Sequence, residues 1–230
     1  MIDQERSAVY GMIADLLLHP NERQTAEVLA KEYCASITHN DVRKAMQTFV
    51  EDATSWSGDE YVRVLELAPP CPLYLGTYLF DEPTTCRGVG TSGRNAYMLE
   101  LGGVYRHFGF QITGGELRDF LPAVVEFCRI SLHKREVDGI GLRRRLLEKF
   151  VLPALKPMEE SLTKFKSSYA NLIAALAHTV LDDLENTETG EPWMPPVVTA
   201  ETEHEVQLAV LSSQDGDRRI APTMTGEENR

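Results

Sequence analysis

Apolar residues recur every three or four positions along most of the chain, which is the spacing of a helix that buries one face. Near the N-terminus this spacing predicts a first helix with an inward face of Val9, Met12, Ile13, Leu16 and Leu17. Pro20 is expected to end that helix, because the residue before a proline disfavours helical geometry. Similar spacing continues to about residue 184, so the sequence predicts an all-α fold.

Three more helices are predicted before residue 69. Asn21 can cap the second helix, whose inward residues should be Val28, Leu29 and Tyr33. Asp41 can cap a third, and residues 58–60 open a short fourth. The cluster Pro69, Pro70 and Pro72 then breaks the helical pattern, because proline has no backbone N–H to donate.

In the middle of the chain the spacing of apolar residues predicts two longer helices. Residues 92–109 should form one of them, and Gly109 is placed to terminate it. Another should begin at Leu121, with Pro122 in its permitted first turn, and run to about Lys134. Residues 73–80 are β-like in composition but have no partner strand, so we interpret them as a buried helical or extended piece.

Two further helices are predicted before the composition changes. One spans 141–155, with Pro153 and Pro157 framing its end, and the last covers about 159–184 with Phe165 on its inward side. Residues 1–185 are therefore expected to form one helical bundle of about eight helices. Beyond it, 186–230 is rich in proline, glycine and acidic residues and is expected to be a largely disordered tail.

The charge of the chain narrows the range of partners. A net charge of −12 argues against nucleic-acid binding, which needs a basic surface to displace counterions. The stretch 129–149 is the basic exception, and two interpretations stay open: a solvated helix face or a docking patch for an acidic partner. No apolar run approaches the roughly 20 residues that span a bilayer, and the acidic N-terminus does not resemble a secretory signal, so we expect a cytoplasmic protein without membrane contact.

The residue types needed for catalysis do not occur in recognisable groups. The four cysteines and six histidines lack metal-ligand spacing, and no serine lies in a nucleophile motif, so we predict no catalytic or metal site. Gly88, Gly90 and Gly93 match a dinucleotide fingerprint in letters only, because no strand directly precedes them. A nucleotide-binding helical protein that uses this loop is one alternative function, and a structural subunit of an oxidoreductase is another.

Three carboxylates close together in the sequence form the main candidate binding site. On one continuous helix Glu116, Asp119 and Glu126 would fall within an arc of about 80°. Because the helix is expected to start at Leu121, Asp119 would instead lie just before its N-terminus, where a carboxylate is favourable. One interpretation is a capping acid with a solvated Glu126. The other is an acidic rim beside an apolar groove that receives a basic, partly hydrophobic peptide.

Residues 60–130 resemble the TorD/DmsD/NarJ family of redox-enzyme maturation chaperones, especially its nitrate-reductase delta-subunit branch. The family pattern combines a Tyr-Val pair, an Arg-Gly pair, a helix ending in Tyr-x₃-Gly, and Glu-Leu-Pro-Asp-x-Leu followed by Glu-Phe. This chain departs from it at Arg118, where the family usually has proline. The matching residues are Tyr61-Val62, Arg87-Gly88, Tyr105 with Gly109, Glu116-Leu117, Asp119, Leu121-Pro122 and Glu126-Phe127.

The resemblance implies a helical chaperone that binds the apo catalytic subunit of a molybdenum enzyme of the dimethyl sulfoxide reductase superfamily. Contact through a twin-arginine leader and contact through the mature subunit both stay open. Such a chaperone assists insertion of the molybdopterin-guanine-dinucleotide cofactor before export. It would hold no cofactor permanently and handle that of its client only transiently. The client-binding residues that the resemblance implies are Glu116, Leu117, Asp119, Leu121, Pro122, Glu126, Tyr61 and Tyr105.

Overall fold

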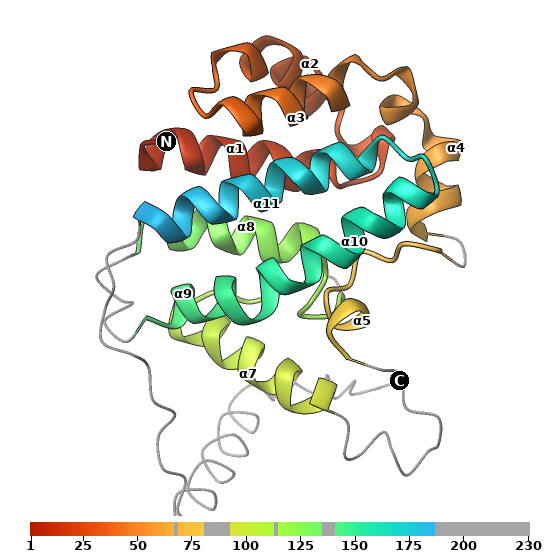
Figure 1. Ribbon diagram of the computed structural model, residues 1–230. Helices are drawn as coiled ribbons and strands as arrows, with labels where there is room; N and C mark the ends of the chain where they lie inside the picture. The colour runs from red at the N-terminus through yellow and green to blue at the C-terminus, as the bar shows by residue number, and fades with distance from the viewer. Residues whose placement is uncertain (67–68, 81–92, 113–114, 135–140, 187–230) are drawn as a thin grey trace, which may run out of the picture. The chain divides into compact units, whose positions relative to one another are not determined.

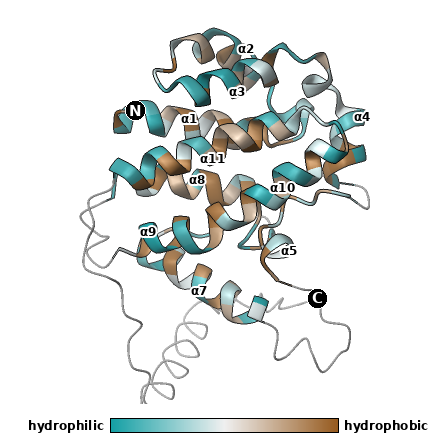
Figure 2. Cartoon of the chain, in the orientation of Figure 1, coloured by the Kyte–Doolittle hydropathy of each residue, from teal (hydrophilic) through white to brown (hydrophobic). Residues whose placement is uncertain are grey.

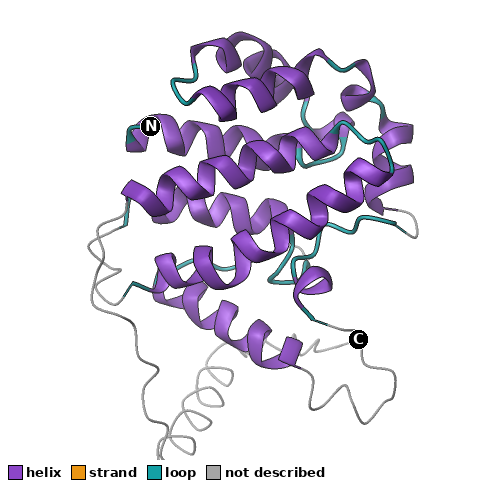
Figure 3. Cartoon of the chain, in the orientation of Figure 1, coloured by secondary structure: helices purple, strands orange, loops and turns teal. Residues whose placement is uncertain are grey.

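Helix α1 packs on α8, α11 and α2 in the computed structural model shown in Figure 1. The structure describes residues 1–66, 69–80, 93–112, 115–134 and 141–186. Over these ranges the regular secondary structure is helical and contains no strand (Figure 3), which confirms the predicted all-α class. The tail predicted for 186–230 lies almost entirely outside the described residues.

The helices follow one another through short turns, several of them 3₁₀ or π. A π-helical turn at Leu147–Val151 joins α9 to α10 without a break. The helices are α1 (Asp3–Leu16), α2 (Gln24–Tyr33), α3 (Asn40–Glu51), α4 (Gly58–Tyr61), α5 (Gly76–Leu79), α7 (Gly93–His107), α8 (Leu121–Ser131), α9 (Leu142–Leu146), α10 (Leu152–Lys164) and α11 (Tyr169–Asn186).

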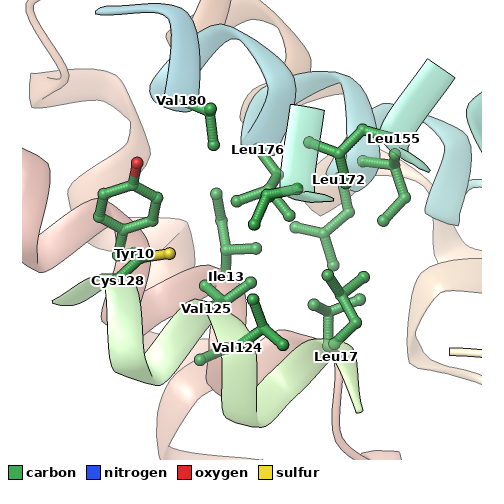
Figure 4. Close-up of a cluster of buried hydrophobic side chains, with 14 of the residues drawn as sticks. Tyr10, Ile13, Leu17, Val124, Val125, Cys128, Leu155, Leu172, Leu176 and Val180 are labelled. Atoms are coloured by element: carbon green, nitrogen blue, oxygen red, sulfur yellow. The ribbon is translucent and has the colours of Figure 1, made fainter. Parts of the chain in front are cut away.

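The core is formed where α1, α8, α10 and α11 meet. Helix α11 packs on α3, α10 and α1, and α8 also packs on α1. Figure 4 shows side chains from these four helices in one cluster, all of them buried. In Figure 2, α8 and α11 carry hydrophobic residues along their length, whereas α3 shows a largely hydrophilic outer side. The labelled members of the cluster are Tyr10, Ile13, Leu17, Val124, Val125, Cys128, Leu155, Leu172, Leu176 and Val180.

Helix α7 confirms the prediction for 92–109 closely. It ends at His107, and Gly109 follows with a φ of +70°, the left-handed conformation that glycine adopts without strain. The N–H of Phe110 donates to the carbonyl of Tyr105 at 2.8 Å, which closes the end of the helix. For the described part of the chain, no helix is long and apolar enough to cross a membrane.

The inward face predicted for the second helix is wrong. Val28 and Leu29 are 56% and 55% exposed, and Tyr33 is only partly buried. Helix α2 instead buries the small side chains Ala26 and Ala30. Small residues let α2 pack closely on its neighbours α1 and α3, and they leave the larger side chains of the helix in solvent.

The prediction of one helix over 159–184 is wrong, because this range contains the end of α10 and most of α11. Helix α10 continues through Pro157 to Lys164, and α11 starts at Tyr169. Between them Lys166 has a φ of 53°, and the N–H of Ser167 donates to the carbonyl of Leu162 at 3.1 Å. This helix-ending turn has lysine where glycine is usual, so the residue types in the sequence do not predict it. Phe165 is exposed, although the sequence predicts it on the inward side.

A buried ion pair joins three of the central helices. Arg143 of α9 donates to Asp183 of α11, and Tyr10 of α1 donates to the same carboxylate at 2.8 Å. Arg143 also donates to the hydroxyl of Ser131 at 2.9 Å. Burial opposes the charge on Arg143, but the hydrogen bonds and charge of Asp183 outweigh it and raise the pKa of the guanidinium.

We expect Asp183→Ala to lower the free energy of unfolding by about 3–5 kcal/mol, because Arg143 would keep its buried charge without the carboxylate that balances it. Urea unfolding followed by circular dichroism measures this loss. The double variant Asp183→Leu/Arg143→Met is the control, and it should recover most of the stability. A single variant as stable as the wild type would contradict the role of the pair.

Candidate functional site

The segment 115–127 is a turn followed by a helix, as predicted. Gly115 has a φ of +80°, helix α8 begins at Leu121, and Pro122 lies in its first turn. The turn is held by main-chain hydrogen bonds to residues 73–75. The N–H of Leu121 donates to the carbonyl of Leu73 at 2.7 Å, and the N–H of Leu75 donates to the carbonyl of Asp119 at 3.1 Å.

The carboxylate of Asp119 is completely buried and holds the neighbouring helix α5. One of its oxygens accepts the N–H of Gly76, the first residue of α5, at 2.9 Å, and Arg94 of α7 lies 3.5 Å from the same oxygen. These contacts of Asp119 are called the Asp119 clamp below. The interpretation of Asp119 as part of an exposed acidic rim is therefore wrong, because its burial leaves no surface for a partner.

The eight predicted client-binding residues divide into an inner and an outer set. Besides Asp119, the buried set contains Tyr105 and Tyr61. The hydroxyl of Tyr105 donates to the carbonyl of Arg118 at 2.8 Å, and the hydroxyl of Tyr61 donates to the carbonyl of Leu17 at 3.1 Å. Leu121 and Pro122 are also buried, in the first turn of α8. All five side chains support the fold from within, and their position does not offer a client direct contact.

The outer set is Glu116, Leu117 and Glu126. Glu116 accepts a hydrogen bond from the hydroxyl of Tyr74 at 3.1 Å, and Leu117 is 47% exposed. Arg118 lies against α7, where it donates to the carbonyl of Met98 at 3.3 Å. Its positive charge is therefore held at α7. We call the exposed pair Glu116 and Leu117 the elbow, and client contact by the outer set stays a prediction.

The substitution Gly76→Ala should break the Asp119 clamp, because a Cβ at that position would lie 2.6 Å from the Asp119 carboxylate. We expect a loss of about 1–3 kcal/mol of stability, typical of a buried polar group that loses its partner. Gly103→Ala is the matched control, since nothing lies within 4 Å of its Cβ position and alanine favours a helix. Chemical unfolding of both variants tests the clamp, and equal stabilities would contradict it.

A groove beside α8 is a prominent concave feature of the described surface. It has a volume of about 560 Å³ and runs along α1, with α2 on one side and α8 on the other. We call it the α1–α2–α8 groove. Its lining comes from three helices: Gln4, Ser7, Ala8, Gly11, Met12 and Asp15 of α1, Ala26, Leu29 and Tyr33 of α2, and Glu126 and Arg129 of α8.

One end of the groove carries two carboxylates and one guanidinium. Arg129 donates through two nitrogens to Glu126, one of these bonds being 2.7 Å long, and its side chain passes over Gly11. Asp15 faces the same pair. Burial raises the pKa of Asp15, and the charge of Glu126 raises it further against the opposing effect of Arg129. With two carboxylates against one guanidinium, this end of the groove is negative overall.

Sequence reasoning missed this groove because it placed Leu29 and Tyr33 in the core. A signal was nevertheless present, since Ala26, Ala30 and Cys34 recur at four-residue intervals and offer a second apolar stripe of smaller side chains. Helix α2 uses that stripe for burial and turns Leu29 toward the groove.

We expect Asp15→Asn to raise the melting temperature at pH 7. A carboxyl whose pKa is raised by folding holds its proton more tightly in the folded state, so its ionised form at neutral pH costs stability. Because Asp15 is largely exposed, the gain should stay below about 1 kcal/mol.

Thermal unfolding from pH 7 downward checks this prediction. The cost of the ionised carboxyl is absent below the unfolded pKa of about 4. The advantage of the Asp15→Asn variant should therefore shrink as the pH approaches that value. An unchanged or lowered melting temperature at pH 7 would contradict it.

The basic stretch 129–149 is largely paired where the structure describes it. Arg145 lies 2.6 Å from Glu100, Arg144 lies 2.6 Å from Glu148, and Arg143 belongs to the buried pair with Asp183. These pairs favour the interpretation as a solvated helix face over a docking patch for an acidic partner.

Of the three glycines of the apparent dinucleotide fingerprint, Gly93 is described and is the first residue of α7. Gly88 and Gly90 fall outside the described residues. Within the described ranges, no group of three or more His, Cys, Asp or Glu side chains is placed to hold a metal ion.

The comparison with known proteins gives one informative relative. No family model matches the chain. It is 27% identical over 187 residues to the probable nitrate reductase molybdenum cofactor assembly chaperone NarJ of Bacillus subtilis (strain 168). This similarity confirms the resemblance to the TorD/DmsD/NarJ family. The match covers 79% of this chain and 91% of NarJ, so it extends well beyond the 60–130 segment that carries the family-like motifs.

Proposed function

We propose that this protein is a cytoplasmic maturation chaperone for a molybdenum oxidoreductase of the nitrate reductase type. The similarity to NarJ over 91% of that protein's length carries the proposal. The all-α fold agrees with it, since the family resemblance implies a helical protein. On this proposal the chain makes and breaks no covalent bond, and its activity is the binding of another protein.

The proposed client is the catalytic subunit before it receives its cofactor. A chaperone holds such a subunit open only if it binds the empty form more tightly than the loaded form, and the difference in affinity sets how far it shifts the equilibrium. Loading of molybdopterin guanine dinucleotide would then release the client. The chaperone would contact that cofactor only in transit, and a leader peptide of the client is one segment it could recognise.

Two surfaces of the described structure are suited to this binding. The elbow offers an exposed carboxylate beside the exposed Leu117, and the α1–α2–α8 groove offers apolar and acidic side chains in a concave setting. The Asp119 clamp supports the elbow from within, because it fixes the turn that carries Glu116 and Leu117. Asp119 is in this account a positioning residue.

Production of a nitrate-reductase-type catalytic subunit with and without this protein tests the proposal. We expect the chaperone to raise the molybdenum content per subunit and the enzyme activity, and to co-purify with the empty subunit alone. The variant Leu117→Gln should weaken that binding roughly tenfold, because it removes an exposed apolar contact. Leu181→Gln is the matched control, since Leu181 is 42% exposed on α11.

Two results would contradict the proposed function. One is a molybdenum content that does not depend on the chaperone. The other is a stable one-to-one complex of this protein with the mature, loaded enzyme, which would indicate a structural subunit instead.

A further inference from the structure

We propose that Arg118 binds a carboxylate of the client, and that the client segment around this acid covers Leu99 and Leu117. These three side chains are called the Arg118 patch. The inference rests on the proposed function for the identity of the client, while the patch and its charge come from the described residues alone. It makes Arg118 a residue that decides which client sequences bind.

The position of Arg118 is fixed by helix α7. Its backbone carbonyl accepts the hydroxyl of Tyr105 at 2.8 Å, and its Nη1 donates to the carbonyl of Met98 at 3.3 Å. Along α7, between these two contacts, the side chain crosses Gly102, where an added Cβ would lie 2.8 Å from Nε of Arg118 and 3.1 Å from its Cζ. Only a residue without a side chain leaves room for the guanidinium there. Arg118 is therefore held in place before a partner binds.

The guanidinium of Arg118 keeps most of its donors free. An arginine carries five N–H donors, and within the described residues only Nη1 of Arg118 has a hydrogen-bond partner. That partner is a main-chain carbonyl, so it does not balance the charge. Arg118 is exposed and forms no salt bridge in the described part of the chain, whereas Arg129 and Arg144 each pair with a glutamate. A guanidinium with free donors fits the two oxygens of a carboxylate.

Two exposed leucines adjoin this cation. Leu117 precedes Arg118 in the chain and is 47% exposed, and Leu99 follows Met98 and is 69% exposed. Each leucine is therefore next to Arg118 or to the residue that accepts its hydrogen bond. Covering both leucines removes apolar surface from water, and the same cover strengthens a charge contact by excluding water from it. The patch thus favours a segment with an acidic residue among apolar ones.

The charge of the patch favours another protein over a second copy of the chain. In a symmetric pair that joins two Arg118 patches, the two guanidinium groups would face each other and repel. Residues 186–230 of the chain also contain acidic and apolar residues, so they are a competing occupant that the experiment separates. The client is the better match, because the patch includes Leu117 of the elbow, which is proposed above for client contact.

Titration of the empty catalytic subunit with variants of the full chain tests the charge of Arg118. Arg118→Gln keeps a long polar side chain without the charge, and it should weaken binding about tenfold. Arg118→Glu should weaken binding further, because it brings two acids together. Lys44→Glu is the matched control, since it makes the same change in charge at an exposed position of α3, which packs on α2 and α11.

A glycine variant tests the position of Arg118. Gly102→Ala keeps every charge but places a methyl group against the guanidinium, so the affinity should fall at least about threefold as the cation loses its fixed position. Gly103→Ala is the matched control and should bind as the wild type does, since nothing lies within 4 Å of its added Cβ. Added salt should weaken wild-type binding more than that of Arg118→Gln, because salt screens charge contacts and not apolar ones.

Three results would overturn the proposal. One is an equal affinity of Arg118→Glu and Lys44→Glu for the empty subunit. Another is an Arg118→Gln variant with the affinity and salt dependence of the wild type. The third is tighter client binding by the variant Leu208→Ser, which would assign the patch to the chain's own C-terminal residues.

Two synthetic peptides separate this proposal from the proposed function. They are identical except for a glutamate or a lysine between two leucines. Fluorescence anisotropy should show that the wild type prefers the glutamate peptide and that Arg118→Glu does not. That result in a protein that does not raise the molybdenum content of the subunit would support the patch and refute the proposed function. Equal binding of both peptides to the wild type would refute the patch.

Discussion

The burial of helix α1 is the constraint on which the rest of this structure depends. Its apolar side is covered by α8 and α11, and the resulting cluster around Ile13 and Leu17 forms the core (Figure 4). The buried pair of Arg143 and Asp183 joins α9 to α11, and Tyr10 of α1 donates a hydrogen bond to the same Asp183 carboxylate. With three helices fixed around it, α1 presents its small-residue face, including Ala8 and Gly11, as the floor of an open groove.

Much of the fold could be predicted from the sequence, because regular apolar spacing and strong stop signals report on local structure. The start of α8 at Leu121 follows from the proline after it, and the end of α7 follows from Gly109. The turn at Lys166 could not be predicted, since a lysine in the left-handed conformation is favoured by the packing of α10 on α11 and not by its own preference.

The candidate site could be predicted only in part, for a related reason. Burial depends on contacts between segments that are distant in the sequence. Asp119 has the residue type of a surface acid, yet its main chain pairs with residue 75 and its carboxylate with Gly76, so it lies inside. Leu29 has the residue type of a core position but is displaced to the surface by the smaller stripe of α2. Glu126 is a candidate residue from the sequence and lines the groove, but the sequence does not predict the groove itself.

Support and proposed contact therefore fall to different residues. Buried residues of the segment 115–127 fix the turn, and exposed residues of the elbow and of α1, α2 and α8 are the ones we propose for contact with a client. Hydrogen–deuterium exchange of this protein, alone and with the empty or the cofactor-loaded catalytic subunit, tests this claim most directly. We predict that the empty subunit slows exchange in the elbow, in α2 and in the second half of α8, and that the loaded subunit does not. Protection that is equal with both forms of the subunit, or that falls elsewhere on the chain, would contradict the account.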